Sequence, residues 1–212
     1  MLAIAGGKGG CGKTTTTLGL AGALGRMRRS VVAVDADVDM PDLHLLAGVT
    51  DSPNLSAVAD GEPVESATHP PPSLTGVGVV PAPQSVAVSV HLPTALPRLS
   101  CAADHVLVDC PAGAGPDAAT PLRIADHVLL VTTPDPACLR DTAKTAAMAR
   151  ALGTTVIGVV TTRADHPPSK IERLLDCPML SSIPDGGVAA LADESVRRGY
   201  DRLASALLSK HL

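Results

Sequence analysis

The sequence predicts an α/β fold, a three-layer α/β/α sandwich around a mostly parallel sheet. Short apolar runs rich in β-branched residues alternate with helical patterns, as in a series of βαβ units. The runs are continuously apolar, which is typical of strands buried on both faces of a parallel sheet. The chain has 212 residues, of which 45% are hydrophobic and 18% charged. These values favour one globular domain, which we expect to span residues 1–212.

The expected strands and helices follow from these patterns in chain order. We expect strands at residues 1–5, 31–34, 77–80, 105–108, 127–132 and 155–161. Helical patterns occur at about residues 13–27, 56–60, 117–124, 138–152, 168–175 and 187–211. Residues 62–100 are rich in proline, which disrupts the hydrogen bonding of regular helices, so we expect loops and short helices there.

Composition excludes several classes of function. Tyr200 is the only aromatic residue, so a protein that grips bases by aromatic stacking is excluded. The net charge of −4 gives no overall attraction to DNA or to acidic membranes. Five cysteines without a C-x-x-C spacing indicate neither a disulfide framework nor a zinc site. The first ten residues do not resemble a signal peptide, and we expect a cytoplasmic protein.

A glycine-rich segment follows the first expected strand and opens the first expected helix. The residues Gly7-Lys8-Gly9-Gly10-Cys11-Gly12-Lys13-Thr14 match the phosphate-loop pattern G-x-x-x-x-G-K-S/T. In such a loop the backbone N–H groups point at phosphate oxygens, Lys13 adds a positive charge, and the Thr14 hydroxyl is a ligand for Mg²⁺. We therefore predict a nucleotide site on residues 7–15, in which Thr15 takes part and Cys11 fills space.

The loop contains a lysine, Lys8, in addition to Lys13, and this residue narrows the choice of protein family. With Lys8, the segment resembles the deviant Walker A motif, KGGxGKT followed by Ser or Thr, of the MinD/ParA family of P-loop ATPases. The resemblance implies a P-loop NTPase fold and an ATP-dependent homodimer in which Lys8 reaches the phosphates of the partner. It therefore implies catalytic roles for both Lys8 and Lys13.

Two carboxylates follow the second expected strand, at the edge of the sheet where open α/β proteins bind their ligands. The stretch of residues 35–48 resembles the first switch segment of the same family. On that match Asp37 positions or polarises the attacking water, and Asp35 supports the Mg²⁺ shell. Asp42 and His44 stand where the family often has Asn and Asp, so they receive no role.

A second acidic segment, Asp109-Cys110-Pro111-Ala112-Gly113, follows the strand at residues 105–108. It resembles the Walker B and second switch sequence D-x-P-A-G of the family. On that match Asp109 holds Mg²⁺ through a water, and Gly113 turns its N–H toward the γ-phosphate and so senses whether ATP or ADP is bound.

The base pocket is expected after the last two apolar runs. Residues 125–141 also resemble the family, so that the resemblance covers most of the chain. Thr162 and Arg163 stand where the family usually has Asn followed by Arg or Lys, and a threonine hydroxyl bonds a base with less directionality than an amide. Pro184 and Asp185 match the family's turn beside the base.

The resemblance is closer to MinD than to the DNA-partitioning branch. It implies a Mg²⁺-dependent ATPase, slow without a regulatory protein partner, that acts in positioning the division site or polar structures. The leucines of residues 203–212 favour a helix that packs on the core, which leaves only weak support for peripheral membrane binding at the inner face.

Two alternatives stay open. The first is a ParA-like DNA-partitioning ATPase, for which Arg197, Arg198 and Arg202 are the only clustered basic residues near the C-terminus. Because these arginines offer few phosphate contacts, nucleic acid is not an expected partner. The second is a scaffold that binds nucleotide without hydrolysing it.

Overall fold

The computed structural model describes residues 1–84, 90–165 and 168–210, and it confirms the predicted α/β fold. The strands are β1 (Leu2–Gly6), β2 (Val31–Asp35), β3 (Val77–Val80), β4 (His105–Asp109), β5 (His127–Thr132), β6 (Thr155–Thr162) and β7 (Met179–Ile183). The α-helices are α1 (Lys13–Arg26), α2 (Leu43–Ala47), α3 (Leu55–Ala59), α4 (Leu92–Leu99), α5 (Pro116–Ile124), α6 (Pro136–Ala151), α7 (Lys170–Leu175) and α8 (Glu194–Lys210). Short 3₁₀ helices lie at η1 (Val64–Ala67) and η2 (Gly187–Ala192).

The seven strands form one sheet in the order β3-β2-β4-β1-β5-β6-β7, and the pairings between them are parallel. β1 is the central strand. The chain leaves it through α1 toward β2 on one side, whereas α6 joins β5 to β6 on the other side. Such a reversal opens a crevice at the carboxyl ends of the central strands, where open α/β sheets bind ligands.

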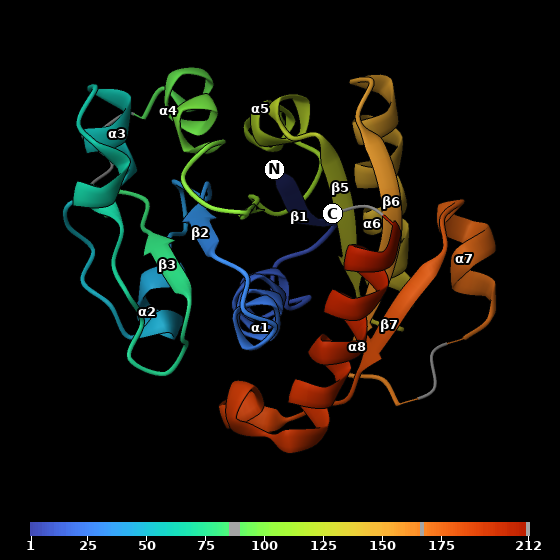
Figure 1. Ribbon diagram of the computed structural model, residues 1–212. Coiled ribbons are helices and arrows are strands. Elements are labelled where there is room, and N and C mark those ends of the chain that lie inside the picture. The colour runs from blue at the N-terminus through green and yellow to red at the C-terminus, as the bar shows by residue number, and fades with distance from the viewer. Residues whose placement is uncertain (85–89, 166–167, 211–212) are drawn as a thin grey trace.

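Helices cover both faces of the sheet (Figure 1). One apolar cluster joins the sheet to α1, α2 and α8, and includes Leu18, Leu24 and Leu203. The other joins it to α3, α4, α5, α6 and α7, and includes Leu96 and Leu122. Because the chain lacks Phe and Trp, both clusters consist mainly of aliphatic side chains.

β7 is a strand that the sequence pattern does not predict. Two of its five residues are serines, which break the apolar run. Both are satisfied by long-range contacts, since the Ser181 hydroxyl donates to the Gly199 carbonyl (2.9 Å) and the Ser182 hydroxyl donates to the Ala164 carbonyl. Tertiary hydrogen bonds therefore allow two polar residues at the edge of the sheet.

The sequence predicts one C-terminal helix at residues 187–211, and this extent is wrong. The structure has two separate helices in this region, η2 and α8, with Asp193 between them. Asp193 caps the second part, with its Oδ1 accepting from the backbone N–H groups of Ser195 (2.8 Å) and Val196 (3.1 Å). Leu203 and Leu207 of α8 are fully buried, while Leu212 lies outside the described residues. Within the described part of the chain, no helix has both the length and the apolarity to cross a membrane.

Candidate functional site

A cleft of about 890 Å³ opens at the carboxyl ends of β1, β2 and β4. The loop after β1 forms one wall and the segment after β2 forms another, and Ala112 after β4 contributes to the lining. The predicted site residues that line this cleft are Gly9, Gly10, Gly12, Lys13, Thr14, Thr15, Asp37 and Arg163. The fold thus brings together the glycine-rich loop and the first acidic segment.

The phosphate loop has the backbone conformation that its glycines allow. Gly10 and Gly12 adopt positive φ angles of 78° and 92°, which residues with a Cβ rarely adopt. Gly12 directly precedes α1, so the free N–H groups at the start of that helix belong to the cleft wall. The loop and the helix end therefore form a site suited to an anion.

The two lysines of the loop have different surroundings. Lys13 is buried, with 8% of its surface exposed, and it lines the cleft. Lys8 is exposed and does not belong to the cleft lining, although Gly9 beside it does. Lys13 can therefore bind a phosphate of the chain's own nucleotide, whereas Lys8 is exposed outside this lining.

Two buried carboxyl groups lie beneath the cleft, side by side on paired strands. Asp35 and Asp109 are register partners in β2 and β4. Burial raises the pKa of Asp35 to about 8, with a smaller contribution from the negative charge of Asp109. Burial also raises the pKa of Asp109 to about 7, partly offset by a hydrogen bond from Thr14.

The Asp109 carboxyl group and the Thr14 hydroxyl fit a divalent cation. Asp109 Oδ1 is buried and has no hydrogen-bond partner, and the Thr14 hydroxyl lies beside the same carboxyl group. A hydroxyl and one carboxylate, completed by phosphate oxygens and water, are the ligands that Mg²⁺ takes in nucleotide sites. Among the described residues no cluster of three or more His, Cys, Asp or Glu side chains could hold a metal.

The carboxyl group of Asp35 is hydrogen-bonded to the backbone of the segment that follows β2. Its Oδ1 accepts from the Asp37 N–H (3.0 Å) and its Oδ2 accepts from the Leu43 N–H (3.2 Å). Both carboxyl oxygens are therefore engaged with the backbone of the segment after β2. Asp35 therefore positions this segment, and its predicted support of the Mg²⁺ shell stays a prediction, because each of its carboxyl oxygens keeps a second lone pair.

Asp37 lies in the segment that Asp35 holds. It is half-buried, and its Oδ1 accepts from the Met40 N–H (3.1 Å). Its carboxyl group thus has a fixed place in the cleft wall, with oxygen lone pairs left over for a water. Asp39 is exposed on the same wall.

Gly113 does not point its N–H into the cleft in this structure. The N–H donates instead to the Gly6 carbonyl (3.1 Å), and the residue has a positive φ of 88°. The predicted contact with a γ-phosphate therefore requires this bond to break. Ala112 is the residue of this segment that lines the cleft.

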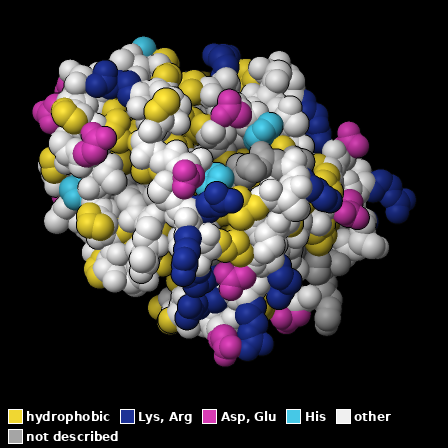
Figure 2. All heavy atoms as spheres, in the orientation of Figure 1, with side chains coloured by type: hydrophobic (Ala, Val, Ile, Leu, Met, Phe, Trp, Pro, Cys, Tyr) yellow, Lys and Arg dark blue, Asp and Glu magenta, His cyan; other side chains and the backbone are white. Residues whose placement is uncertain are grey.

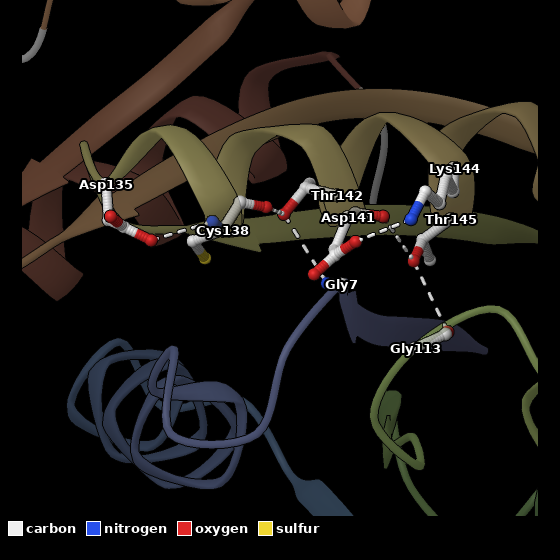
Figure 3. Close-up of polar contacts among 8 residues, drawn as sticks. All are labelled: Gly7, Gly113, Asp135, Cys138, Asp141, Thr142, Lys144 and Thr145. Atoms are coloured by element: carbon white, nitrogen blue, oxygen red, sulfur yellow. Dashed lines mark hydrogen bonds and ion pairs between the residues drawn. The ribbon is translucent and has the colours of Figure 1, made fainter.

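Helix α6 contacts both the phosphate loop and the segment after β4 (Figure 3). The sequence did not predict these contacts. The Gly7 N–H donates to Thr142 Oγ1 (3.4 Å), and the Thr145 hydroxyl donates to the Gly113 carbonyl (3.3 Å). Gly7 packs so closely that an added Cβ would lie 2.0 Å from the Asp141 carbonyl carbon. No local pattern marks Thr142 or Thr145, which stand one helical turn apart on the face toward the loops.

The predicted base-pocket residues surround a smaller cavity of about 80 Å³ that is continuous with the phosphate loop. Thr162, Arg163, Pro184 and Asp185 line it, and Gly12 and Thr15 are shared with the main lining. The Thr162 hydroxyl donates to the Cys11 carbonyl (2.7 Å) and lies 3.3 Å from the Thr132 carbonyl. In this arrangement the hydroxyl proton is engaged with backbone carbonyls, but the hydroxyl oxygen can still accept a hydrogen bond from a base, so the predicted contact between Thr162 and a base stays a prediction.

A family model described as the CobQ/CobB/MinD/ParA nucleotide binding domain matches residues 2–187. The chain belongs to this family. An uncharacterized ATP-binding protein of Methanocaldococcus jannaschii is 32% identical over 196 residues, which make up 87% of this chain and 74% of that protein.

Two solved structures have the same fold as this member of the family. The cell division ATPase MinD of Pyrococcus furiosus is 31% identical, with a TM-score of 0.86 and coverage of 98% of both chains. MinD of Pyrococcus horikoshii, complexed with Mg-ADP, is 29% identical, with a TM-score of 0.87 and coverage of 99% of this chain and 96% of that one. The predicted family, its MinD branch and the predicted cofactors ATP and Mg²⁺ are thereby confirmed.

Proposed function

We propose that this MinD-like protein hydrolyses ATP with Mg²⁺ and uses the bound nucleotide to control its own dimerisation, in positioning the division site or polar structures. The observation that carries the proposal is the separation of the two lysines. Lys13 is buried in the chain's own cleft, while Lys8 is exposed beside it and outside its lining. A lysine in this position can bind the phosphates of the nucleotide that a second copy of the chain carries.

The residues around the cleft have separate tasks in this reaction. Lys13 and the loop N–H groups bind the phosphate oxygens, and Thr14 and Asp109 would hold Mg²⁺, which neutralises phosphate charge when it is bound. Asp37 orients the attacking water through its free carboxyl lone pairs. Phosphoryl transfer needs little more from a protein than this positioning and charge stabilisation.

Substitution of Lys8 tests the exchange of lysines between subunits. In light scattering, the parent protein should be a dimer with Mg-ATP and a monomer with Mg-ADP, and Lys8→Ala should weaken the dimer about tenfold or more. Lys144→Ala is the control, because Lys144 is an exposed lysine of α6 that pairs with Asp141 outside the cleft. A parent protein that stays monomeric in both nucleotides would instead favour the non-hydrolysing scaffold.

An exposed apolar surface beside the cleft supports contact with a second copy. Of the five large apolar side chains exposed in the described part of the chain, three lie on the segment after β2: Met40 (78%), Leu45 (71%) and Leu46 (44%). All three line the rim of the cleft. Apolar side chains gathered at the mouth of a nucleotide site are typical of an interface.

A charge placed on this rim should separate the two copies. We expect Leu45→Glu to weaken the Mg-ATP dimer about tenfold or more, because a carboxylate would be desolvated in the interface. Leu174→Glu on α7 makes the same change at a residue that is 49% exposed and remote from the cleft, and it should leave the dimer intact. If light scattering gives the two variants equal dimer affinity, the rim is not part of the interface.

The charge distribution gives little support to the DNA-partitioning alternative. Lys and Arg side chains on the face shown in Figure 2 are interspersed with Asp and Glu side chains. Of the three arginines that this alternative would use, Arg198 pairs with Glu194 one turn earlier on α8. This pairing reduces the charge that Arg198 offers to a phosphate backbone.

A further inference from the structure

The hydroxyl group of Thr145 joins helix α6 to the segment after β4 (Figure 3). The side chain is buried, and its oxygen lies 3.3 Å from two acceptors, the Gly113 carbonyl and the Asp141 carbonyl one turn earlier in the same helix. A threonine in a helix can satisfy its hydroxyl with that earlier carbonyl alone. The contact with Gly113 is therefore additional, and none of the steps proposed for phosphate binding or hydrolysis uses it.

The backbone of Gly113 is attached on both sides. Its N–H donates to the Gly6 carbonyl at the end of β1 (3.1 Å), and its own carbonyl accepts from Thr145. A Cβ on Gly113 would lie 3.9 Å from the Gly7 carbonyl oxygen, so the residue stands next to the first residue of the phosphate loop. Its φ is positive at 88°, and a residue without a Cβ can leave such a conformation for others at low cost. Gly113 is thus held beside the phosphate loop by bonds to β1 and α6 rather than by its own stiffness.

The predicted contact between the Gly113 N–H and a γ-phosphate requires this attachment to change. The N–H must leave the Gly6 carbonyl and move toward the cleft, and the Gly113 carbonyl, joined to it through one Cα, moves away from Thr145 in the same shift. The Thr145 hydroxyl can then bond the Asp141 carbonyl alone, so that no buried hydroxyl loses its partner. Release therefore costs one modest hydrogen bond, not the larger penalty of an unsatisfied donor.

We propose that Thr145 is a positioning residue that determines how strongly the site distinguishes ATP from ADP, by holding Gly113 on β1 and α6. This role rests on the nucleotide function proposed above. ADP has no γ-phosphate and leaves the Gly113 contacts in place, whereas ATP gains the Gly113 N–H only after those contacts are broken. A bond that favours the arrangement compatible with ADP therefore lowers the affinity for ATP and leaves that for ADP unchanged.

Thr142, one turn earlier on the same face of α6, offers the matched comparison. Its Oγ1 accepts from the Gly7 N–H (3.4 Å) and donates to the Cys138 carbonyl (2.9 Å). Gly7 begins the loop that binds the phosphates shared by ATP and ADP. Loss of the Thr142 hydroxyl should therefore lower the affinity for both nucleotides by the same factor, whereas loss of the Thr145 hydroxyl should change their ratio.

The test measures the affinity of the full chain for Mg-ADP and for the Mg²⁺ complex of β,γ-imido-ATP, an analogue that is not hydrolysed. In Thr145→Val, affinity for the analogue should rise about threefold or more, as expected for the loss of one hydrogen bond, while affinity for ADP stays the same. Thr145→Ser keeps the hydroxyl and should restore the ratio of the parent. Titrations at two protein concentrations about tenfold apart separate this effect from dimerisation, which makes the apparent affinity depend on concentration.

Amide hydrogen exchange gives a second readout, which does not require hydrolysis. With Mg-ADP bound, peptides that contain Gly113 should exchange faster in Thr145→Val than in the parent or in Thr145→Ser. Thr145→Ala makes the same removal if Thr145→Val does not fold.

Two results would overturn the proposal. One is an unchanged ratio of affinities in Thr145→Val, because the N–H then turns without displacing the carbonyl, and the other is a Thr145→Ser variant that behaves like Thr145→Val. A parent protein that binds neither nucleotide would overturn the nucleotide function as well. The failure of this inference alone is therefore distinguishable from the failure of the function on which it rests.

Discussion

Replacing Asp37 with alanine is expected to lower ATP turnover by about 10²–10⁴-fold, the range over which a positioned general base acts. The carboxyl group lies in the cleft wall, fixed by the hydrogen bonds that join Asp35, the Asp37 N–H and the Met40 N–H. Alanine removes the group that orients water and leaves Lys13 and Thr14 in place. The variant should therefore bind Mg-ATP and remain a dimer, because hydrolysis no longer releases the two copies.

Asp39→Ala is the matched control for this prediction. Asp39 lines the same wall and loses the same charge on substitution, but it is exposed and we assign it no role. Phosphate release and light scattering should be measured on both variants in Mg-ATP. If the two variants hydrolyse ATP equally fast, the loss reflects only the negative charge of the wall, and Asp37 does not orient the water.

The parts of the site that the sequence predicts are those whose chemistry is local. The loop from Gly7 to Thr14 is contiguous, and Asp35 and Asp109 each end an apolar strand. Parallel strands bring their carboxyl ends to one edge, so the meeting of these segments follows from the fold class. The alternation of strands and helices was therefore enough to place them together.

Contacts between distant segments were beyond prediction. Thr142 and Thr145 are ordinary helix residues until α6 is packed against Gly7 and Gly113. Thr162 occupies the position of an amide in the family, yet its hydroxyl is turned to the Cys11 carbonyl 151 residues away. The direction of a hydroxyl depends on which carbonyl the fold brings near, and no periodicity encodes that choice.

The closest packing in the site is between Gly7 and α6, and it yields the second prediction. A Cβ at Gly7 would lie 2.0 Å from both the Asp141 carbonyl carbon and the Thr142 nitrogen, which are backbone atoms that a rotamer change cannot move away. In Gly7→Ala, either the loop or the helix must shift. We expect the free energy of unfolding to fall by about 1–3 kcal/mol, as in other overpacked sites. Affinity for Mg-ATP should fall about a hundredfold, because the phosphate-binding N–H groups move with the loop.

Gly9→Ala gives the comparison that isolates this contact. Gly9 belongs to the same loop, but a Cβ there meets no atom within 4 Å. Its backbone φ is not positive, so alanine introduces no strain. Thermal or urea unfolding without nucleotide should therefore leave Gly9→Ala within about 0.5 kcal/mol of the parent. Equal stability of the two variants would mean that the loop and α6 separate at little cost, and α6 would then not fix the position of the phosphate loop.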